Sequence, residues 1–427
     1  MSCSGNDYLK VLPRESVAMA SVDLSQLASS EKESLSRSLR ESQGIDDLYA
    51  AGIDLSSKVY AFEMPDGTLG FVAKVDDADV LTNTFVKLSD KGKCTKPEAR
   101  RGNMFTMLGD AWLAGYSDDA LIVIGPITVM QRKATEQIMQ RMFAHDESQG
   151  ASGSRIFHRL DSLDAPVALV AQTSALPEKV VLPFTIGMPK GADASQIVVS
   201  ATMSKEDGIM VVRGNTFSFN KQIDKKLKEN REVFQPVTDD MFGRLPSRGM
   251  GFLFMNADGE KLLNVLQQGK EFQALLAGAN VAIDMDNIIR GIKGDMVLSL
   301  NDFNGSADFI ARLGKRSFLD DVDYWKKSCP AGSTITDLGK DSYIYKGGDF
   351  SYSFAVTSDN LFISSLRHDE AKDVEDVALN MPDEISSKIK GSRLAMLMDL
   401  GKTGNQTVTS IVKPILGGTD KVLYIME

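Results

Sequence analysis

The feature that most constrains this chain is an internal repetition of its pattern of strands, turns and helices. "LPRESVAMASVDLSQL" begins at Leu12 and "LPSRGMGFLFMNADGEKLL" begins at Leu245, and each places a Leu-Pro pair before an alternating apolar segment. Two copies of one plan predict two related domains, because each copy has apolar faces to bury. A chain of 427 residues is long enough for two or three domains.

The predicted strands recur in the same order in both copies. Four hairpins are predicted in two corresponding pairs: 58–75 with 295–313, and 110–125 with 349–365. Tight turns join these strands, and Phe71 of the first copy aligns with Phe309 of the second. We therefore expect an α+β fold of two tandem copies of an antiparallel sheet, with helices packed mainly on one face.

The repeat divides the chain into three predicted regions. Residues 1–11 form a tether, 12–235 the first α+β repeat, and 236–427 a second, shorter α+β repeat. The first copy continues through a strand at 208–216 and a charged helix, whereas the second copy ends at Glu427. Either the second copy is naturally shorter, or the chain is truncated.

A cysteine near the start of the chain indicates where the protein resides. In "MSCSGNDYLKV", Cys3 follows the small residue Ser2 and precedes a polar spacer, which is the pattern of a processed lipoprotein signal. No intact signal peptide is present, as expected if an apolar leader is removed. The alternative is an incidental cysteine near a start site. Because no apolar run approaches the ~20 residues of a membrane-spanning helix, a lipid on Cys3 would be the anchor.

The same opening, "CSGNDYLKVLPRESVAMASVDLSQL", resembles the domain-of-unknown-function 4836 family of Bacteroidetes lipoproteins. The cysteine, the short tether, the Leu-Pro pair and a strand that ends in Asp-Leu carry the resemblance. It implies a cell-envelope protein that is lipid-anchored to the outer membrane, with Cys3 as the attachment site and no assigned activity. The early end of the second copy departs from the family's plan.

Three short motifs occur in the order typical of penicillin-recognising serine enzymes. They lie at 29–32, 358–360 and 402–404. Such an enzyme needs Ser29 at the buried start of a helix and Lys32 one turn later, where it accepts the serine proton. Residues 29–42 are polar nearly all round, and 358–360 already fits a predicted hairpin turn. We therefore interpret the motifs as coincidence and predict no catalytic residues.

Metal and redox chemistry find little support in the sequence. The three histidines and three cysteines lack metal-ligand spacing, so we predict no metal ion and no cofactor. Acidic groups at 76–79, 284–286 and 320–323 lack the EF-hand pattern and are interpreted as helix caps, with a loose calcium site as the alternative. Cys94 and Cys329 hold nearly matching positions; lone thiols are expected, and a disulfide between the copies is the alternative.

Composition and the remaining motifs limit which partners we expect. A net charge of −10 argues against sequence-independent nucleic-acid binding. The sequence around Ser162, Asp-Ser-Leu, fits a short acceptor pattern for O-glycosylation. Ligand pockets favour domain interfaces. We therefore hypothesise a single ligand site between the copies, near loops 183–196 and 414–421.

Taken together, these patterns favour a non-catalytic binding or structural lipoprotein. Its expected partners are the membrane, through the lipid anchor, and an unknown protein or glycan ligand. The alternatives are a serine acyl-enzyme that uses Ser29 and Lys32, and a glycan-handling accessory protein.

Overall fold

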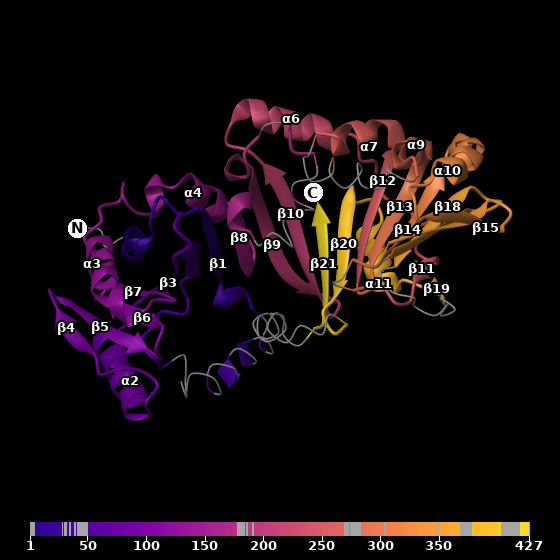
Figure 1. Cartoon of the computed structure of the whole chain (residues 1–427). Coiled ribbons are helices and arrows are strands. Elements are labelled where there is room, and N and C mark those ends of the chain that lie inside the picture. Colours follow the sequence, from indigo (N-terminus) through magenta and orange to yellow (C-terminus); the bar gives the residue numbers. More distant parts are fainter. Residues whose placement is uncertain are drawn as a thin grey trace. The chain divides into compact units, whose positions relative to one another are not determined.

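A computed structural model describes most of the chain, and Figure 1 shows its helices and strands in chain order. The described residues are all except these: 1–4, 28, 30–31, 34–35, 38–39, 41–49, 177–183, 185–186, 190–191, 269–272, 274–282, 303–304, 349, 368–377, 403–418 and 427. They separate into two compact units. The first holds the described residues of Met1–Val180 and Val198–Ser204, and the second those of Val181–Ile197, Lys205–Thr409 and Thr419–Glu427.

The first unit is a sheet that carries short helices. Its helices are η1 (Asp7–Val11), η2 (Leu24–Gln26), α2 (Ala78–Asp90), η3 (Val129–Gln131), α3 (Arg132–Phe143), η4 (Ala151–Gly153), α4 (Arg155–Asp161) and η5 (Thr173–Ala175). Its strands are β1 (Ala18–Val22), β2 (Val59–Glu63), β3 (Leu69–Lys74), β4 (Glu98–Arg100), β5 (Asn103–Leu108), β6 (Trp112–Tyr116), β7 (Ala120–Gly125), β8 (Val167–Gln172) and β9 (Val198–Glu206). Neighbouring strands pair antiparallel in the order β4-β5-β6-β7-β3-β2-β1-β8-β9.

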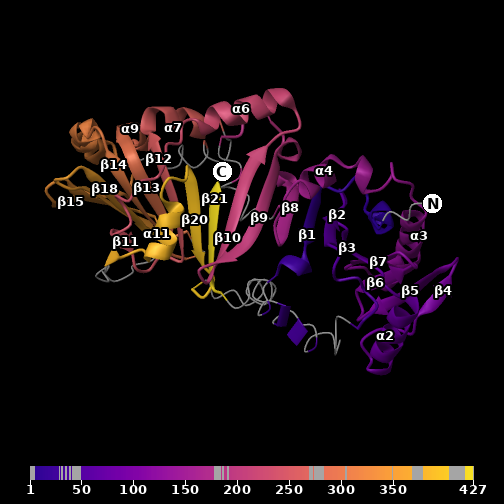
Figure 2. The ribbon, with the colours of Figure 1, turned by 180° about the vertical axis from the view of Figure 1, so that it is seen from behind.

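The second unit is also a sheet with helices. Its helices are η6 (Ala194–Gln196), α6 (Lys221–Arg231), α7 (Gly259–Leu266), α9 (Met285–Gly291), η7 (Ser317–Asp321), α10 (Val322–Ser328) and α11 (Asp383–Ile389). Its strands are β10 (Ile209–Phe217), β11 (Leu245–Pro246), β12 (Gly251–Asp258), β13 (Ile292–Leu300), β14 (Ala307–Leu313), β15 (Thr334–Gly339), β16 (Ser342–Gly347), β17 (Phe350–Val356), β18 (Leu361–Arg367), β19 (Ala378–Leu379), β20 (Leu394–Asp399) and β21 (Lys421–Met426). Figure 2, the view from behind, shows α6, α7 and α9 in one row along these strands.

The strands of the second unit follow the same order as those of the first. Their order is β15-β16-β17-β18-β14-β13-β12-β20-β21, and β10 then follows β21. Phe71 on β3 lies opposite Val123 of β7, and Phe309 on β14 lies opposite Ser364 of β18. Phe71 and Phe309 therefore hold the same place in the two orders, as their alignment in the sequence predicts.

The predicted α+β class is confirmed, and one detail of the prediction is wrong. Strand β10 pairs with β21 in parallel, although every other pair in the two orders is antiparallel. Helices lie on both faces of the second unit's sheet, with α7, α9 and α10 contributing to one core and α11 to another. The reason is that strands such as "GFLFMNAD" of β12 are apolar at successive positions, so each face needs a cover.

The predicted copy boundary at residue 235 stays a prediction about the repeat. The compact units divide elsewhere, because β10 and α6 lie in the second unit.

Local sequence explains the hairpins and the helix starts. Between β2 and β3 the turn at Asp66 and Gly67 is confirmed, because Gly67 has a φ of 82° and Asp66 Oδ1 accepts the Thr68 N–H at 2.9 Å. Helix α2 begins after Asp77, whose carboxylate accepts two backbone N–H groups. Its buried side chains then recur every three to four residues: Leu81, Phe85 and Leu88.

Candidate functional site

The sheet of the first unit presents two chemically similar faces. Register places alternate residues of each strand on opposite sides. On one side, called here the inner face, Met19, Tyr60, Phe62, Val72 and Val170 are all at most 3% exposed. Helix η1 contacts β3, α4 contacts β1 and β8, and α3 contacts β6 and β7 of the same sheet, so the inner face is the unit's main core.

The opposite side is called here the open face. Its residues on β1, β2, β3, β6, β7 and β8 are Ala18, Ala20, Val22, Val59, Ala61, Glu63, Leu69, Phe71, Trp112, Val123, Val167 and Leu169. Helix α2 packs at the β5–β7 end of this side, where it covers Ala114 and Tyr116. Across β1, β2 and β3 these side chains are half-buried or exposed, whereas Ala73, two residues after Phe71 on the same side of β3, is buried.

Two side chains stand out on the open face. Phe71 is 45% exposed and Leu69 is 39% exposed. The Trp112 ring lies against Phe71 with 5.8 Å between ring centroids. These three side chains form an aromatic and aliphatic centre that solvent reaches.

The open face carries a single ionisable group among these residues. Glu63 lies opposite Leu69 and Ala18, and burial raises the pKa of its carboxyl group. The outer face of an antiparallel sheet normally alternates to polar residues, which hydrate it. A contiguous apolar face of this kind is typical of a surface that binds a partner or an apolar ligand.

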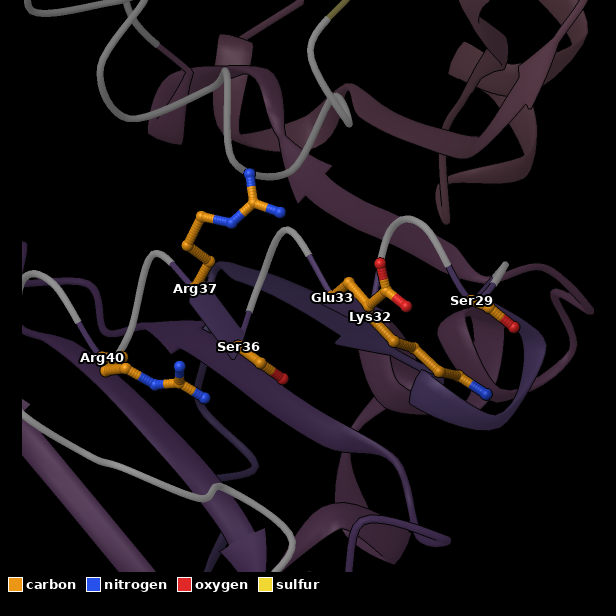
Figure 3. Close-up of a pocket in the computed structure, with 6 residues that line it drawn as sticks. All are labelled: Ser29, Lys32, Glu33, Ser36, Arg37 and Arg40. Carbon is orange, nitrogen blue, oxygen red and sulfur yellow. The ribbon is translucent and has the colours of Figure 1, made fainter.

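A pocket with basic side chains lies in the same unit, and Figure 3 shows it. It is lined by residues at helical spacing: Ser29, Lys32, Glu33, Ser36, Arg37 and Arg40. We call it the basic pocket, since its lining includes three cations and one carboxylate in a chain of net charge −10. In Figure 3 the Lys32 side chain extends toward Ser29, and Lys32 Nζ donates to the Ser25 carbonyl at 3.4 Å.

A second hollow shares Lys32 with the basic pocket and is lined by residues that follow β1 and β3 or lie beside them. We call it the edge hollow; it is lined by Leu24, Ser25, Lys32, Ile53, Asp54, Leu55, Ser56 and Asp76. Leu24 follows β1 by two residues, and Ile53 forms a bridge with Val75 just after β3. Lys32 therefore lines both hollows, next to an edge of the open face.

The carboxylate of Asp54, which lines the edge hollow, accepts several hydrogen bonds. Lys74 Nζ donates to Asp54 Oδ2 at 2.9 Å, and Ser56 and Ser57 also donate to this carboxylate. The Ser56 and Lys74 hydrogen bonds hold the pKa of Asp54 far below its usual range. Lys74 offsets the charge of Asp54, which leaves the ammonium of Lys32 as the cation that lines both hollows.

The residues of the alternative serine enzyme do not form the arrangement that such chemistry needs. Ser29 is exposed rather than at the buried start of a helix, and Lys32 is half-buried. The 358–360 motif is the β17–β18 turn, as predicted, and Arg244 pairs there with Asp359 at 3.2 Å. Lys402 Nζ donates to the carbonyls of Ser247 and Gly249. Residues 403–404 lie outside the described part.

The other predicted site residues have mixed outcomes. Cys3 lies outside the described residues, so its lipidation stays a prediction. Ser162 is exposed at the end of α4, where its hydroxyl donates to the Arg159 carbonyl at 2.7 Å. Cys94 and Cys329 are free thiols, as expected.

The acidic groups cap helices at two of the three predicted places. Asp77 caps α2 and Asp284 caps α9 through side-chain hydrogen bonds to backbone N–H groups. Asp321 precedes α10 without such a bond and instead accepts from Asn287. Within the described ranges, no three His, Cys, Asp or Glu residues are grouped as around a metal ion.

Two further findings concern ligands and membranes. Of the loops predicted to form a site between the copies, residues 183, 185–186, 190–191 and 414–418 lie outside the described residues, and the site stays a prediction. Every helix in the described part is too short or too polar to cross a bilayer.

The open face itself is absent from the predictions. A signal was present, because "VYAFE" of β2 and "LGFVAK" of β3 are apolar at both alternating positions, which indicates strands with two apolar faces. To decide which of those faces meets solvent, one must know which elements pack against each strand. The alternation of residues does not give this information.

Comparisons with known proteins place the chain in a family. No curated protein matches it. Solved structures of TP0453 are similar to half of it: crystal form IV has a TM-score of 0.34 at 10% identity and covers 50% of this chain and 81% of that one. Crystal form I has a TM-score of 0.32 at 11% identity, covering 52% and 82%. Likeness at this level carries no argument about structure or function. The profile of the domain of unknown function DUF4836 matches residues 32–403, and the chain belongs to that family.

Proposed function

We propose that this chain is a non-catalytic binding protein of the cell envelope, held to the outer membrane by a lipid on Cys3. The open face of the first unit would be its binding surface. The observation that supports binding is the solvent-exposed cluster of Phe71, Leu69 and Trp112 on a face with one ionisable group. The support for lipidation is the sequence around Cys3.

A non-catalytic role also agrees with how the motif residues are used. Asp359 and Lys402 bind protein groups of the second unit, whereas Ser29 and Lys32 belong to the first. Fluorescent penicillin provides the test, and we expect no covalent band on the gel. A band that disappears in Ser29→Ala would replace this proposal with a serine acyl-enzyme.

We also infer that the two units descend from one duplicated α+β plan. The support is that nine strands of each unit follow the same order of neighbours, with Phe71 and Phe309 at the same place. Under this hypothesis the open face is a specialisation of the first unit.

The binding role is tested with the apolar fluorophore N-phenyl-naphthylamine on the full chain. We expect binding to weaken strongly in Phe71→Ser and in Leu69→Ser, because both remove apolar surface from the open face. The matched controls are Phe350→Ser and Leu338→Ser, since Phe350 is 40% and Leu338 61% exposed in the second unit. Equal loss in test and control variants would reject the open face as the surface.

Lipidation has its own test. Intact-mass measurement of the N-terminal peptide from the native membrane fraction should give a diacyl or triacyl mass increase on Cys3, because stable anchoring takes more than one chain. An unmodified Cys3 in that fraction would exclude the anchor and leave the binding role untouched.

A further inference from the structure

We propose that the open face binds an amphipathic α-helix of a partner protein, laid along β1 and β2. This inference rests on the proposed function, because it names the class of partner for the same surface. Its support is a groove with a floor of alanines, the carboxylate of Glu63 at one end, and the helices that cover the corresponding face of the second unit.

The groove is defined by the size of the side chains on four neighbouring strands. One row of residues runs from Phe71 on β3 through Ala61 on β2 and Ala20 on β1 to Leu169 on β8. Each alanine extends a single methyl group from the sheet, whereas the side chains of Phe71 and Leu169 reach farther. The alanines therefore form a floor between two walls, and large side chains of an occupant can enter above it.

The groove has the width of one helix. Its walls stand three inter-strand steps apart, and steps of about 4.8 Å make this separation about 14 Å. An α-helix with its side chains measures about 10–12 Å across. Along β1 the groove extends from Ala18 to Val22, which is about 14 Å at about 3.4 Å per residue. This length accommodates about nine residues of helix.

The size of the groove also argues against a second copy of this chain as its occupant. A surface of about 14 by 14 Å has an area of about 200 Å². A stable protein–protein interface buries about 800 Å² on each partner. Because a short helix matches the smaller area, we commit to a helical segment, and a second copy becomes an outcome of the test.

The second unit shows that a sheet of this strand order accepts helices on this face. Its corresponding row consists of Phe309 on β14, Leu298 on β13, Leu253 on β12 and Met396 on β20. Three of these, all except Leu298, pack against a core to which α7, α9 and α10 contribute. In the first unit, the described helix on this face is α2, which packs at the β5–β7 end. The groove over β1 and β2 therefore corresponds to a region that helices cover in the second unit.

Glu63 gives the groove a preference for positive charge at one end. It is half-buried and lies opposite Ala18 of β1 and Leu69 of β3. Burial raises the pKa of its carboxyl group, and no described donor or cation lowers it. A lysine or arginine of the helix would supply the missing counter-charge. We therefore expect a helix that combines an apolar stripe with a cation at one end.

The test uses two synthetic peptides of leucine and lysine on the full chain, each about 14 residues long and identical in composition. In one peptide, leucines recur every three to four residues, which favours an amphipathic helix; in the other, leucine and lysine alternate, which favours a strand. Fluorescence anisotropy of the labelled peptides measures binding. We expect the helical peptide to bind about tenfold more tightly. Because both peptides carry the same charge, their general attraction to an acidic chain is the same.

Two variants, Ala20→Leu and Ala61→Leu, fill the floor with the residues that the second unit has there. Each should weaken binding of the helical peptide by about tenfold, because the added side chain takes the space of one leucine of the peptide. Glu63→Gln should weaken it by about threefold, and added salt should reduce that difference. The control, Ala134→Leu, adds the same side chain at an exposed position of α3 and should have no effect.

Equal affinities for the two peptides, or an unchanged affinity in both floor variants, would overturn this inference. The proposed function survives that result if Phe71→Ser still weakens binding of N-phenyl-naphthylamine. It fails if Phe71→Ser leaves binding of that probe unchanged. Thermal unfolding of each variant checks its fold, and if one floor variant unfolds, the other carries the comparison.

Photo-cross-linking separates the helix from other occupants of the groove. With p-benzoyl-phenylalanine in place of Phe71, we expect a cross-link to the helical peptide, which mass spectrometry maps. A cross-link to a second copy, or to another segment of the same chain, that excess helical peptide does not displace would assign the groove to that occupant and overturn the inference.

Discussion

Phe71 and Phe309 hold the same place in two sheets of the same strand order, yet their surroundings differ. Phe71 is 45% exposed on the open face. Phe309 is half-buried and packs against the core of the second unit, with its ring centroid 6.1 Å from that of Phe362. The difference shows that strand order does not determine which face of a sheet becomes core. The elements that pack over a face determine it.

The covering elements of the second unit are its helices. Side chains of α7, α9, η7 and α10 enter the core beneath them: Leu262, Ile288, Phe318, Val322 and Trp325. In the first unit α2 supplies Leu81, Phe85 and Leu88 to the β5–β7 end of the corresponding face. The remainder of that face keeps its apolar side chains at the surface, which is why we assign binding there.

The inner sides of the two sheets differ in another way. Gly70 lies opposite Phe62 in the first unit, whereas Asp308 lies opposite Ser299 at the corresponding place in the second. Arg248 and Arg367 both bind the buried Asp308 carboxylate, at 2.7 and 2.9 Å. In the first unit the Phe62 ring thus lies over Gly70 at this position, whereas in the second unit the position holds the ion-paired carboxylate of Asp308.

The largest effect is expected from a core ring of the second unit. Phe354 is 2% exposed and contacts the rings of Trp325, Tyr343 and Phe362. Phe354→Ala should lower the free energy of unfolding of this unit by about 3–5 kcal/mol, through lost burial and a cavity.

Tryptophan fluorescence during urea unfolding can assign that loss to one unit. Trp112 belongs to the first unit and Trp325 to the second, so a Trp112→Phe background leaves Trp325 as the reporter. The control, Phe71→Ala, should change stability by less than about 0.5 kcal/mol. Similar losses in both variants would remove the contrast between the two faces.

The ion-paired carboxylate should give the next effect. Asp308→Ala leaves the guanidinium groups of Arg248 and Arg367 without their shared partner, and breaking a buried pair costs about 3 kcal/mol or more. Urea unfolding followed by Trp325 measures it. A cost below about 1 kcal/mol would mean that the two arginines are solvated well enough without the carboxylate.

A smaller effect is expected at the corresponding glycine. A Cβ on Gly70 would overlap the Phe62 ring, so Gly70→Ala should destabilise the first unit by about 1–3 kcal/mol. Unfolding followed by Trp112, in a Trp325→Phe background, reports the change. Phe62→Leu in the same chain should recover part of it, and a purely additive double variant would contradict the contact.

The smallest effect concerns the ionisable group of the open face. Burial raises the pKa of Glu63, so the folded chain binds this proton more tightly than the unfolded chain does. Its contribution to stability is therefore present at low pH and declines as pH rises through the pKa. Glu63→Gln should be slightly more stable than the original chain at pH 7 and equal to it near pH 3, as measured by thermal unfolding. A variant less stable at pH 7 would show that the carboxylate has a favourable partner.

Local patterns predicted much of the fold. The hairpins were predictable because alternation and turn residues such as Asp66 and Gly67 act over a few positions. The correspondence of Phe71 with Phe309 was predictable from the repeat. The parallel pairing of β10 with β21 was not, because it joins residues about two hundred positions apart along the chain.

The candidate site was less predictable than the fold. The segment around Lys32 is polar and was interpreted as solvated, and the structure places Lys32 beside Leu24 and Ile53. That neighbourhood depends on where β1 and β3 end in three dimensions. Exposure of Phe71 depends on how far the described helix on that face, α2, reaches across the sheet, and no short sequence pattern encodes this.

Hydroxyl-radical footprinting tests the central claim most directly, by comparing oxidation of Phe71 and Phe309 in the full chain. The account predicts that Phe71 is oxidised several-fold faster than Phe309, because rates follow exposure. It also predicts that bound N-phenyl-naphthylamine slows oxidation of Phe71 and leaves the rate at the exposed Phe350 unchanged. Equal rates at Phe71 and Phe309, or no protection of Phe71 by the bound probe, would contradict it.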